Sequence, residues 1–146
     1  MAARTAVDEV DRRLIDLLRA DGRMSVNELA RRASVSRATA YQRLARLREE
    51  DVIRRFTVEV DPAQVGLPIA ALVMVNVVQH AWRSVGERLR RLPGVEWLGL
   101  SAGPFDYVML VRAPDVEHLR DVILDGLQAI PEVQGTQTLF LLDEPR

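Results

Sequence analysis

The sequence predicts an α+β protein with two parts, an N-terminal helix-turn-helix domain of three helices and a C-terminal βαββαβ sandwich. Within residues 25–48, apolar side chains recur with the period of two short amphipathic helices around a three-residue turn. From residue 68 onward, strand and helix patterns alternate in the order βαββαβ. The charge divides in the same way: residues 1–60 carry 13 arginines and 10 carboxylates (net +3), and residues 61–146 carry 7 and 11 (net −4).

Residues that favour helix caps mark the start of each of the three N-terminal helices. Asp8 precedes the first apolar stripe, and Ser25 and Glu28 form the S-x-x-E pattern of a capping box at the second helix. Ser36 follows the turn at residues 33–35 and is placed to cap the third helix. The first stripe comprises Val10, Leu14, Leu17 and Leu18. Three helices are the minimum that buries a helix-turn-helix core.

Turn and strand signals predict the linker and the domain boundaries. Asp51 stands after the third helix, where a left-handed cap is expected. Residues 52–60 are rich in β-forming side chains, which predicts a strand. Pro62 and Gly66 are typical of the first position and the exit of a single helical turn. We therefore expect a helix-turn-helix domain over residues 1–51, a strand-and-turn linker over residues 52–67, and an αβ sandwich over residues 68–146.

Four strands and two helices are predicted in the sandwich. The strands are expected at residues 69–78, 95–102, 107–112 and 133–142, and the helices at residues 82–92 and 116–130. The inward-facing residues of these helices are expected to be Trp82, Val85, Leu89 and Leu92, then Val116, Leu119, Ile123, Leu127 and Ile130. This order predicts a four-stranded antiparallel sheet with both helices on one face, the ferredoxin-like arrangement.

The predicted strands are apolar on both faces. In residues 70–78, alanine, valine, leucine and methionine occupy alternate positions on each side, and residues 107–111 and 139–142 repeat the pattern. A sheet with helices on one face should instead alternate apolar with polar side chains. The uncovered face would exceed the apolar area that a soluble monomer exposes. A second copy of the sheet is the simplest cover, so we predict a homodimer formed by the C-terminal domain.

Several classes of protein do not fit this composition. The chain has no cysteine, which excludes disulfide frameworks and the common zinc sites. His80 and His118 are isolated, so no metal site is expected. No apolar run reaches the roughly 20 residues of a membrane helix, and the N-terminus has no signal-like apolar region. A protein of the cytoplasm, without a membrane partner and without a cofactor, is expected.

The predicted third helix points to double-stranded DNA as the partner. Residues 31–48 contain six arginines and no carboxylate, and a compact helix pair of this kind fits the major groove. The residues assigned to base edges are Arg37, Ala38, Thr39 and Gln42. The residues assigned to phosphates are Arg43 and Arg46, supported by Ser25, Ser36 and Tyr41.

These residues and their spacing resemble the Lrp/AsnC (feast/famine) regulators over nearly the whole chain. The matching motifs are Asp8-x-x-Asp11-Arg12-Arg13-Leu14-Ile15, Asp21-Gly22-Arg23-x-Ser25, Glu28-Leu29-Ala30, Ser34-Val35-Ser36, Arg43-Leu44-x-Arg46-Leu47, Val52-Ile53, Val60-Asp61-Pro62, Gly66, Leu92-Pro93-Gly94-Val95, Gly103-x-Phe105-Asp106 and Thr136-x-Thr138. Two positions depart from the family: Asp51 replaces its usual glycine, and Arg37 stands where a small residue or proline is frequent.

The resemblance implies a DNA-binding transcriptional regulator with a C-terminal effector-binding (RAM) domain, dimers that build tetramers or octamers, and an amino acid as effector. It also implies an effector cleft between neighbouring dimers. In that cleft Asp106 can receive an ammonium group, Gly103 permits close approach of the backbone, and three hydroxyl groups can donate to a carboxylate. The hydroxyl residues are Ser101, Thr136 and Thr138. Ordinary hairpin turn chemistry is the alternative explanation for Gly103 and Asp106.

Two other functions remain open from the residues alone. A small βαββαβ enzyme such as an acylphosphatase needs a glycine-rich anion loop after the first sandwich strand, but residues 79–83 read Gln-His-Ala-Trp-Arg. No Ser/His/Asp set or pair of carboxylates stands out as catalytic. A ligand sensor that binds no DNA is the third possibility, and the basic third helix argues against it.

Overall fold

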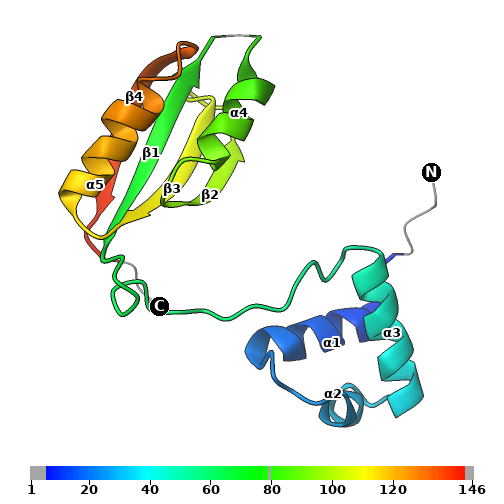
Figure 1. The fold of residues 1–146 in the computed structure, drawn as a ribbon. Coiled ribbons are helices and arrows are strands. Elements are labelled where there is room, and N and C mark those ends of the chain that lie inside the picture. Colours follow the sequence, from blue (N-terminus) through cyan, green and yellow to red (C-terminus); the bar gives the residue numbers. More distant parts are fainter. Residues whose placement is uncertain (1–5, 79, 144–146) are drawn as a thin grey trace. The chain divides into compact units, whose positions relative to one another are not determined.

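The computed structural model describes residues 6–78 and 80–143, and these fold into two compact units. One unit extends to Glu59 and the other begins at Val60. Figure 1 shows the helices of the first unit and the sheet and helices of the second. The N-terminal unit is all helical, and the C-terminal unit is a sheet with helices packed on it. The predicted α+β class is confirmed.

The N-terminal unit contains α1 (Glu9–Ala20), α2 (Val26–Ala33) and α3 (Arg37–Glu49). Its core is built from the apolar stripes of all three helices, and the fully buried members are Leu14, Leu29, Ala30, Ala33, Ala40 and Leu47. The predicted helix-turn-helix is confirmed. The turn between α2 and α3 includes Ser34 in the left-handed region at φ 57°.

The reciprocal capping box lies at α1 and not at α2. At α1, the backbone N–H of Asp11 donates to the Asp8 carboxylate and the N–H of Asp8 donates to the Asp11 carboxylate. At α2, Ser25 accepts from the N–H of Glu28, but the Glu28 carboxylate accepts hydrogen bonds from Arg31 and Arg32 instead of returning to the cap. The S-x-x-E pattern predicted only half of this box, because guanidinium donors compete for the glutamate.

The chain beyond α3 confirms one prediction and overturns another. Asp51 adopts the left-handed conformation expected of the cap, with φ 56°. The strand predicted over residues 52–60 is wrong, since the described chain forms no strand there. A strand needs a hydrogen-bonding partner, and the described residues of this segment have no strand pairing. Its apolar side chains Phe56, Val58 and Val60 are exposed.

The C-terminal unit has the predicted βαββαβ order. Its elements are β1 (Ile69–Val77), α4 (Trp82–Arg90), β2 (Val95–Leu100), β3 (Tyr107–Ala113), α5 (Val116–Asp121), the π-helical turn η1 (Val122–Leu127) and β4 (Val133–Leu141). The strands are antiparallel in the order β2-β3-β1-β4. Figure 1 shows α4 and α5 on the same face of this sheet. The ferredoxin-like arrangement is confirmed.

Two residues predicted to face inward are exposed. Trp82 begins α4 and is 43% exposed, with the Arg83 guanidinium 4.7 Å from its ring centroid. Val116 begins α5 and is 55% exposed. Both stand in the first turn of their helix, where the stripe has not yet reached the sheet. After Asp121 the helix widens into η1, which shifts the phase of the stripe.

The two faces of the sheet differ in burial. The face under the helices holds the core, in which Val73, Val75, Met109 and Val111 are completely buried. On the opposite face, strand register aligns Trp97 with Leu110, Leu110 with Leu72, and Leu72 with Leu139. This apolar row crosses all four strands, and Trp97 and Leu139 are 55% and 46% exposed. We call it the outer apolar row. Among the described residues, no helix is long and apolar enough to cross a membrane.

Candidate functional site

The solvent-facing side of α3 presents most of the residues assigned to base edges. Arg37, Ala38 and Gln42 are exposed, and Thr39 is half-buried. Tyr41, which was assigned to phosphate support, is also exposed. Because α3 turns by about 100° per residue, Ala38 and Gln42 lie opposite the buried Ala40 and Leu47. The structure therefore places Ala38 and Gln42 on the accessible face of α3, with Arg37 exposed in the first turn.

Two serines hold the N-terminal ends of α2 and α3. Ser36 Oγ accepts the backbone N–H of Thr39 at 3.0 Å and lies 2.7 Å from Thr39 Oγ1. Ser25 Oγ accepts the N–H of Glu28 at 3.2 Å. Both serines are exposed, so the positive ends of two helix dipoles stand open to solvent. A helix N-terminus with free N–H groups favours an anion such as a phosphate.

Arg43 and Arg46, in contrast, are bound to carboxylates of the chain itself. Arg43 Nη1 donates to Asp8 and, at 3.1 Å, to Asp11 Oδ1. Arg46 Nη2 donates to the other oxygen of Asp11. Asp11 is completely buried, and the arginine side chains are only 27% and 30% exposed. We call these four residues the α1–α3 clamp.

The ion pairs of the clamp shift the pKa values of Asp8 and Arg43. Hydrogen bonds from Arg43, then from the backbone of Asp11, lower the pKa of Asp8 from 3.8 to about 2. The same partner, Asp8, and then Asp11 raise the pKa of Arg43. Asp8 and Arg43 are therefore both ionised throughout the neutral range. The Nε of Arg46 is buried and has no hydrogen-bond partner among the described residues.

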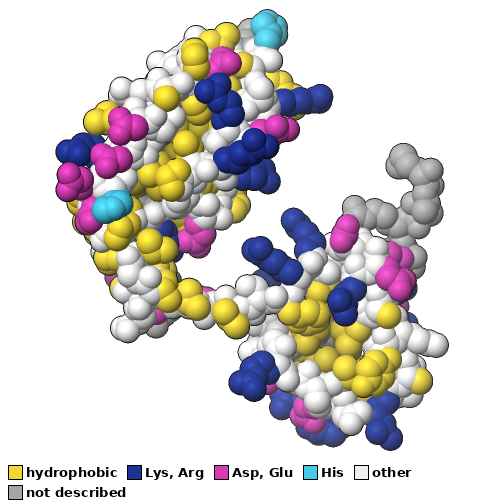
Figure 2. Space-filling view, viewed as in Figure 1, with side chains coloured by type: hydrophobic (Ala, Val, Ile, Leu, Met, Phe, Trp, Pro, Cys, Tyr) yellow, Lys and Arg dark blue, Asp and Glu magenta, His cyan; other side chains and the backbone are white. Residues whose placement is uncertain are grey.

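Glu28 neutralises a second pair of arginines. It accepts from Arg31 Nε at 2.9 Å, from Arg31 Nη2 at 2.6 Å and from Arg32 Nε at 2.6 Å. These bonds, with that of Arg31 largest, lower the pKa of Glu28 to about 2. Four of the six arginines in residues 31–48 are thus ion-paired, whereas the described residues give Arg37 and Arg48 no ion pair. Figure 2 shows acidic side chains among the arginines on this unit.

In the C-terminal unit, four of the five predicted effector residues lie around one end of β1. Asp106 and Thr136 lie on opposite sides of Val75, since the N–H of Asp106 donates to the Val75 carbonyl and Thr136 pairs with Val75 in β4. Ser101 and Gly103 belong to the same hairpin loop, and Gly103 N–H donates to Ser101 Oγ at 3.1 Å. Thr138 lies two residues further along β4 and is half-buried.

Asp106 is partly engaged in holding the sheet together. Its Oδ2 accepts the backbone N–H of Val77 at 2.8 Å, and its own N–H lies 3.3 Å from Asn76 Oδ1. The Asp106 carbonyl accepts the N–H of Ser101 at 2.8 Å. Only the bond from Ser101 belongs to the hairpin turn chemistry considered above, whereas the other two hold Asp106 against β1. The described hydrogen bonds leave the second carboxylate oxygen for another partner.

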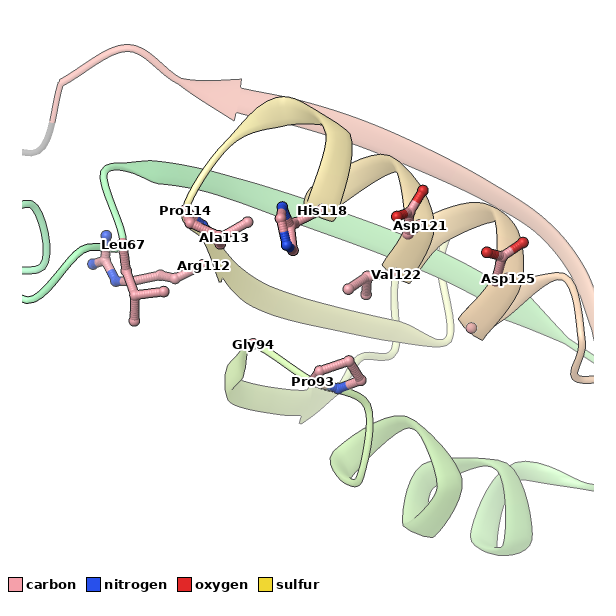
Figure 3. A pocket seen from close by; sticks show the side chains of 11 residues that line it. Leu67, Pro93, Gly94, Arg112, Ala113, Pro114, His118, Asp121, Val122 and Asp125 are labelled. Carbon is pink, nitrogen blue, oxygen red and sulfur yellow. The ribbon is translucent and has the colours of Figure 1, made fainter.

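A cavity that the sequence did not predict lies at the other end of the sheet. It has a volume of about 590 Å³ and is bounded by the residues before β2, the end of β3, and α5 with η1. Figure 3 shows His118, Asp121 and Asp125 along the helix, with Pro93 and Gly94 across from them. The remaining lining residues are Leu67, Arg112, Ala113, Pro114, Val122 and Gly126. Hydrophobic periodicity carries no signal for a gap between elements.

His118 on the rim of this cavity bonds to Asp115. Its Nδ1 lies 2.8 Å and 2.9 Å from the two Asp115 oxygens, and this contact raises the pKa of His118. Among residues 6–78 and 80–143, no group of three or more metal-ligating side chains forms a metal site.

Comparison with known proteins matches both units. Residues 7–48 match the family model of the AsnC-type helix-turn-helix domain, and residues 70–146 match that of the Lrp/AsnC ligand binding domain. The chain is 38% identical over 143 residues to the HTH-type transcriptional regulator AldR of Mycobacterium tuberculosis, covering 96% of this chain and 80% of that protein.

Solved structures agree with the sequence matches. The crystal structure of AldR from M. tuberculosis superposes with a TM-score of 0.80 at 35% identity, over 95% of this chain and 96% of that one. Bacillus subtilis LrpC gives a TM-score of 0.84 at 27% identity, over 97% and 99%. A Neisseria meningitidis regulator in complex with L-Met shares the fold, with a TM-score of 0.87 at 24% identity over 97% and 93%. With both of its domains matched, the chain belongs to the Lrp/AsnC family of DNA-binding transcriptional regulators.

Proposed function

We propose that this regulator reads an operator sequence with the open face of α3. The observation that carries the proposal is the exposure of Ala38 and Gln42 opposite the buried side of α3, with Arg37 exposed in its first turn. Gln42 would pair with adenine and Arg37 with guanine, and the Thr39 methyl group would contact thymine, as these residue types do in major grooves. Ser25, Ser36 and Tyr41 lie around this face and would contact phosphates, which position the helix without selecting sequence.

Selection of bound duplexes from a random library by the purified protein tests this assignment. We expect a preferred sequence to emerge, and Gln42→Ala to relax the preference at one base pair while leaving affinity for non-selected DNA unchanged. Arg19→Gln, an exposed arginine on α1 for which no ion pair is described, serves as the control. A wild-type selection with no preferred sequence, or an unchanged preference in Gln42→Ala, would refute base reading by α3.

The second part of the proposal is regulation by an amino acid bound to the C-terminal domain. Support comes from the ligand-binding-domain match over residues 70–146 and from the neighbour of the same fold solved with L-Met. Ser101, Gly103, Asp106 and Thr136 surround one end of β1, with Thr138 beyond them, and offer hydroxyl donors and a carboxylate oxygen. An ammonium group and a carboxylate group are what such a set would recognise.

Thermal-shift measurements against the individual amino acids test the effector. At least one amino acid should raise the melting temperature of the wild type, and Thr136→Val should abolish that rise. Gln134→Ala, on an exposed position of the same strand, should retain it. If no amino acid stabilises the protein, the effector assignment is wrong.

The third part of the proposal is a homodimer through the outer apolar row, with dimers assembling further into tetramers or octamers. The row joins Trp97, Leu110, Leu72 and Leu139 across the whole sheet. Such a surface is typical of an obligate interface. Sedimentation should show Leu110→Asp shifting the protein toward monomer, whereas Gln134→Asp should not. A monomeric wild type would rule out this interface.

A further inference from the structure

The arginines of α3 face different surroundings according to their side of the helix. Successive residues are separated by about 100°, which places Arg43 and Arg46 on the flank of α3 that faces α1. There they meet Asp8 and the completely buried Asp11. The clamp arginines therefore border the proposed DNA face but are already occupied.

Moving a clamp arginine onto a phosphate would carry an electrostatic cost. Arg46 has Asp11 as its described partner, so its departure would remove one of the two cations that neutralise a carboxylate with no exposed surface. A buried charge that loses its partner is strongly destabilised. Arg43 would similarly have to leave both Asp8 and Asp11.

We propose that Asp8 and Asp11 hold Arg43 and Arg46 away from DNA phosphates and thereby lower the affinity of the regulator for arbitrary DNA. The inference rests on the proposed placement of α3 on DNA. Phosphate contacts supply most of the affinity for non-specific sequences. Withholding two guanidinium groups reduces that background, while the base contacts of Arg37 and Gln42 are left in place. The two carboxylates would thus act as positioning residues that raise the ratio of specific to non-specific binding.

Salt dependence distinguishes a released arginine from a simple change in net charge. Each phosphate neutralised adds about 0.9 to the slope of log K against log salt concentration. The experiment measures binding of the full chain to a random-sequence duplex over a range of salt concentrations. Asp11→Asn, which frees Arg46, is compared with Asp16→Asn. Asp16 is exposed on the same helix, has no described ion pair, and gives the same change in net charge.

We expect the slope of Asp11→Asn to be steeper than that of Asp16→Asn by about 0.9. Adding Arg46→Gln to Asp11→Asn should return the slope to that of the wild type, a rescue that a merely structural role would not give. If Asp11→Asn does not fold, Asp8→Asn frees one of the two bonds of Arg43 and should steepen the slope in the same direction. Equal slopes for the Asp11 or Asp8 variant and Asp16→Asn would overturn the inference.

The outcomes also separate this inference from the proposed function. A wild type that binds a selected duplex, with an Asp11→Asn slope equal to that of Asp16→Asn, refutes only the role of the clamp. A wild type without preference for any duplex refutes base reading by α3, whatever the slopes of the variants.

Discussion

The two halves of α3 carry similar side chains but have different surroundings. In the first half, Arg37 and Gln42 are exposed and the described residues give Arg37 no ion pair. In the second half, Arg43 and Arg46 are bound to carboxylates that α1 supplies from more than thirty residues away. The number of arginines in a helix is therefore a poor measure of the charge that the helix can offer to DNA.

The contrast separates recognition from stability within one helix. The first half of α3 is held in place by the cap at Ser36 and by the packing of Ala40. The second half of α3 is held in place by the buried Leu47 and by the α1–α3 clamp. We expect substitutions of Arg37 and Gln42 to change base reading, and substitutions in the clamp to change stability and the affinity for arbitrary DNA.

The largest effect on stability is expected for Asp11→Ala. This change leaves two half-buried guanidinium groups without a shared carboxylate, and loss of one partner of a buried ion pair is costly. We expect the free energy of unfolding, measured by urea denaturation, to fall by about 3 kcal/mol, the lower end for a buried ion pair, because both arginines are partly exposed. Asp16→Ala, on the exposed side of α1, should change it by less than about 0.5 kcal/mol. Equal losses in the two variants would show that the clamp does not stabilise the domain.

A smaller effect on stability is expected when the cap at the start of α3 is removed. Ser36→Ala deletes the acceptor for the Thr39 N–H, and loss of such a cap costs about 1 kcal/mol. Urea denaturation should detect this loss, and exchange of the amide hydrogens in the first turn of α3 should accelerate. Ser84→Ala, whose hydroxyl donates back to its own helix start at Ala81, should be closer to neutral. Unchanged exchange in the first turn would contradict this role of Ser36.

The smallest effect is the pH dependence that Asp8 contributes to the clamp. Asp8 has a pKa of about 2 in the folded protein and 3.8 without its partners, so the folded state binds the proton less readily. Its contribution to stability is therefore complete above pH 4 and is lost as the pH falls toward 2. In an NMR titration, Arg43→Gln should raise the pKa of Asp8 toward 3.8. The pKa of Glu28 should not move, because Arg31 and Arg32 cause its shift. If the pKa values of Asp8 and Glu28 both rise in Arg43→Gln, the two ion-pair clusters are not separate.

Much of the fold followed from local patterns. The periods of apolar residues predicted all three N-terminal helices and the βαββαβ order, because each stripe is short and ends at a cap, glycine or proline. The failure at residues 52–60 has a clear cause: composition indicates that a segment favours a strand but cannot supply a partner. Trp82 and Val116 are exposed because they lie at the ends of helices. The period of apolar residues does not show whether the end of a helix is buried.

The ion pairs of the candidate DNA-binding residues could not be predicted from the sequence. The count of charges over residues 31–48 begins three positions after Glu28 and therefore leaves this carboxylate out. A spacing of three or four residues nevertheless places Glu28 beside Arg31 and Arg32 on the helix. The Asp8 and Asp11 contacts depend on how α1 packs against α3. The motifs that contain Asp8, Asp11, Arg43 and Arg46 show that these residues are present but not that they meet.

The most direct test compares the Arg37→Gln and Arg46→Gln variants in their binding to the selected duplex and to random DNA. It asks whether Arg37 contacts DNA while Arg46 is held by the clamp. For Arg37→Gln, the account predicts a loss of about 1–3 kcal/mol in discrimination between the two duplexes. For Arg46→Gln, checked to be folded at the temperature used, it predicts wild-type discrimination and a wild-type salt slope. A slope lowered by about 0.9 in Arg46→Gln, with discrimination unchanged in Arg37→Gln, would contradict it.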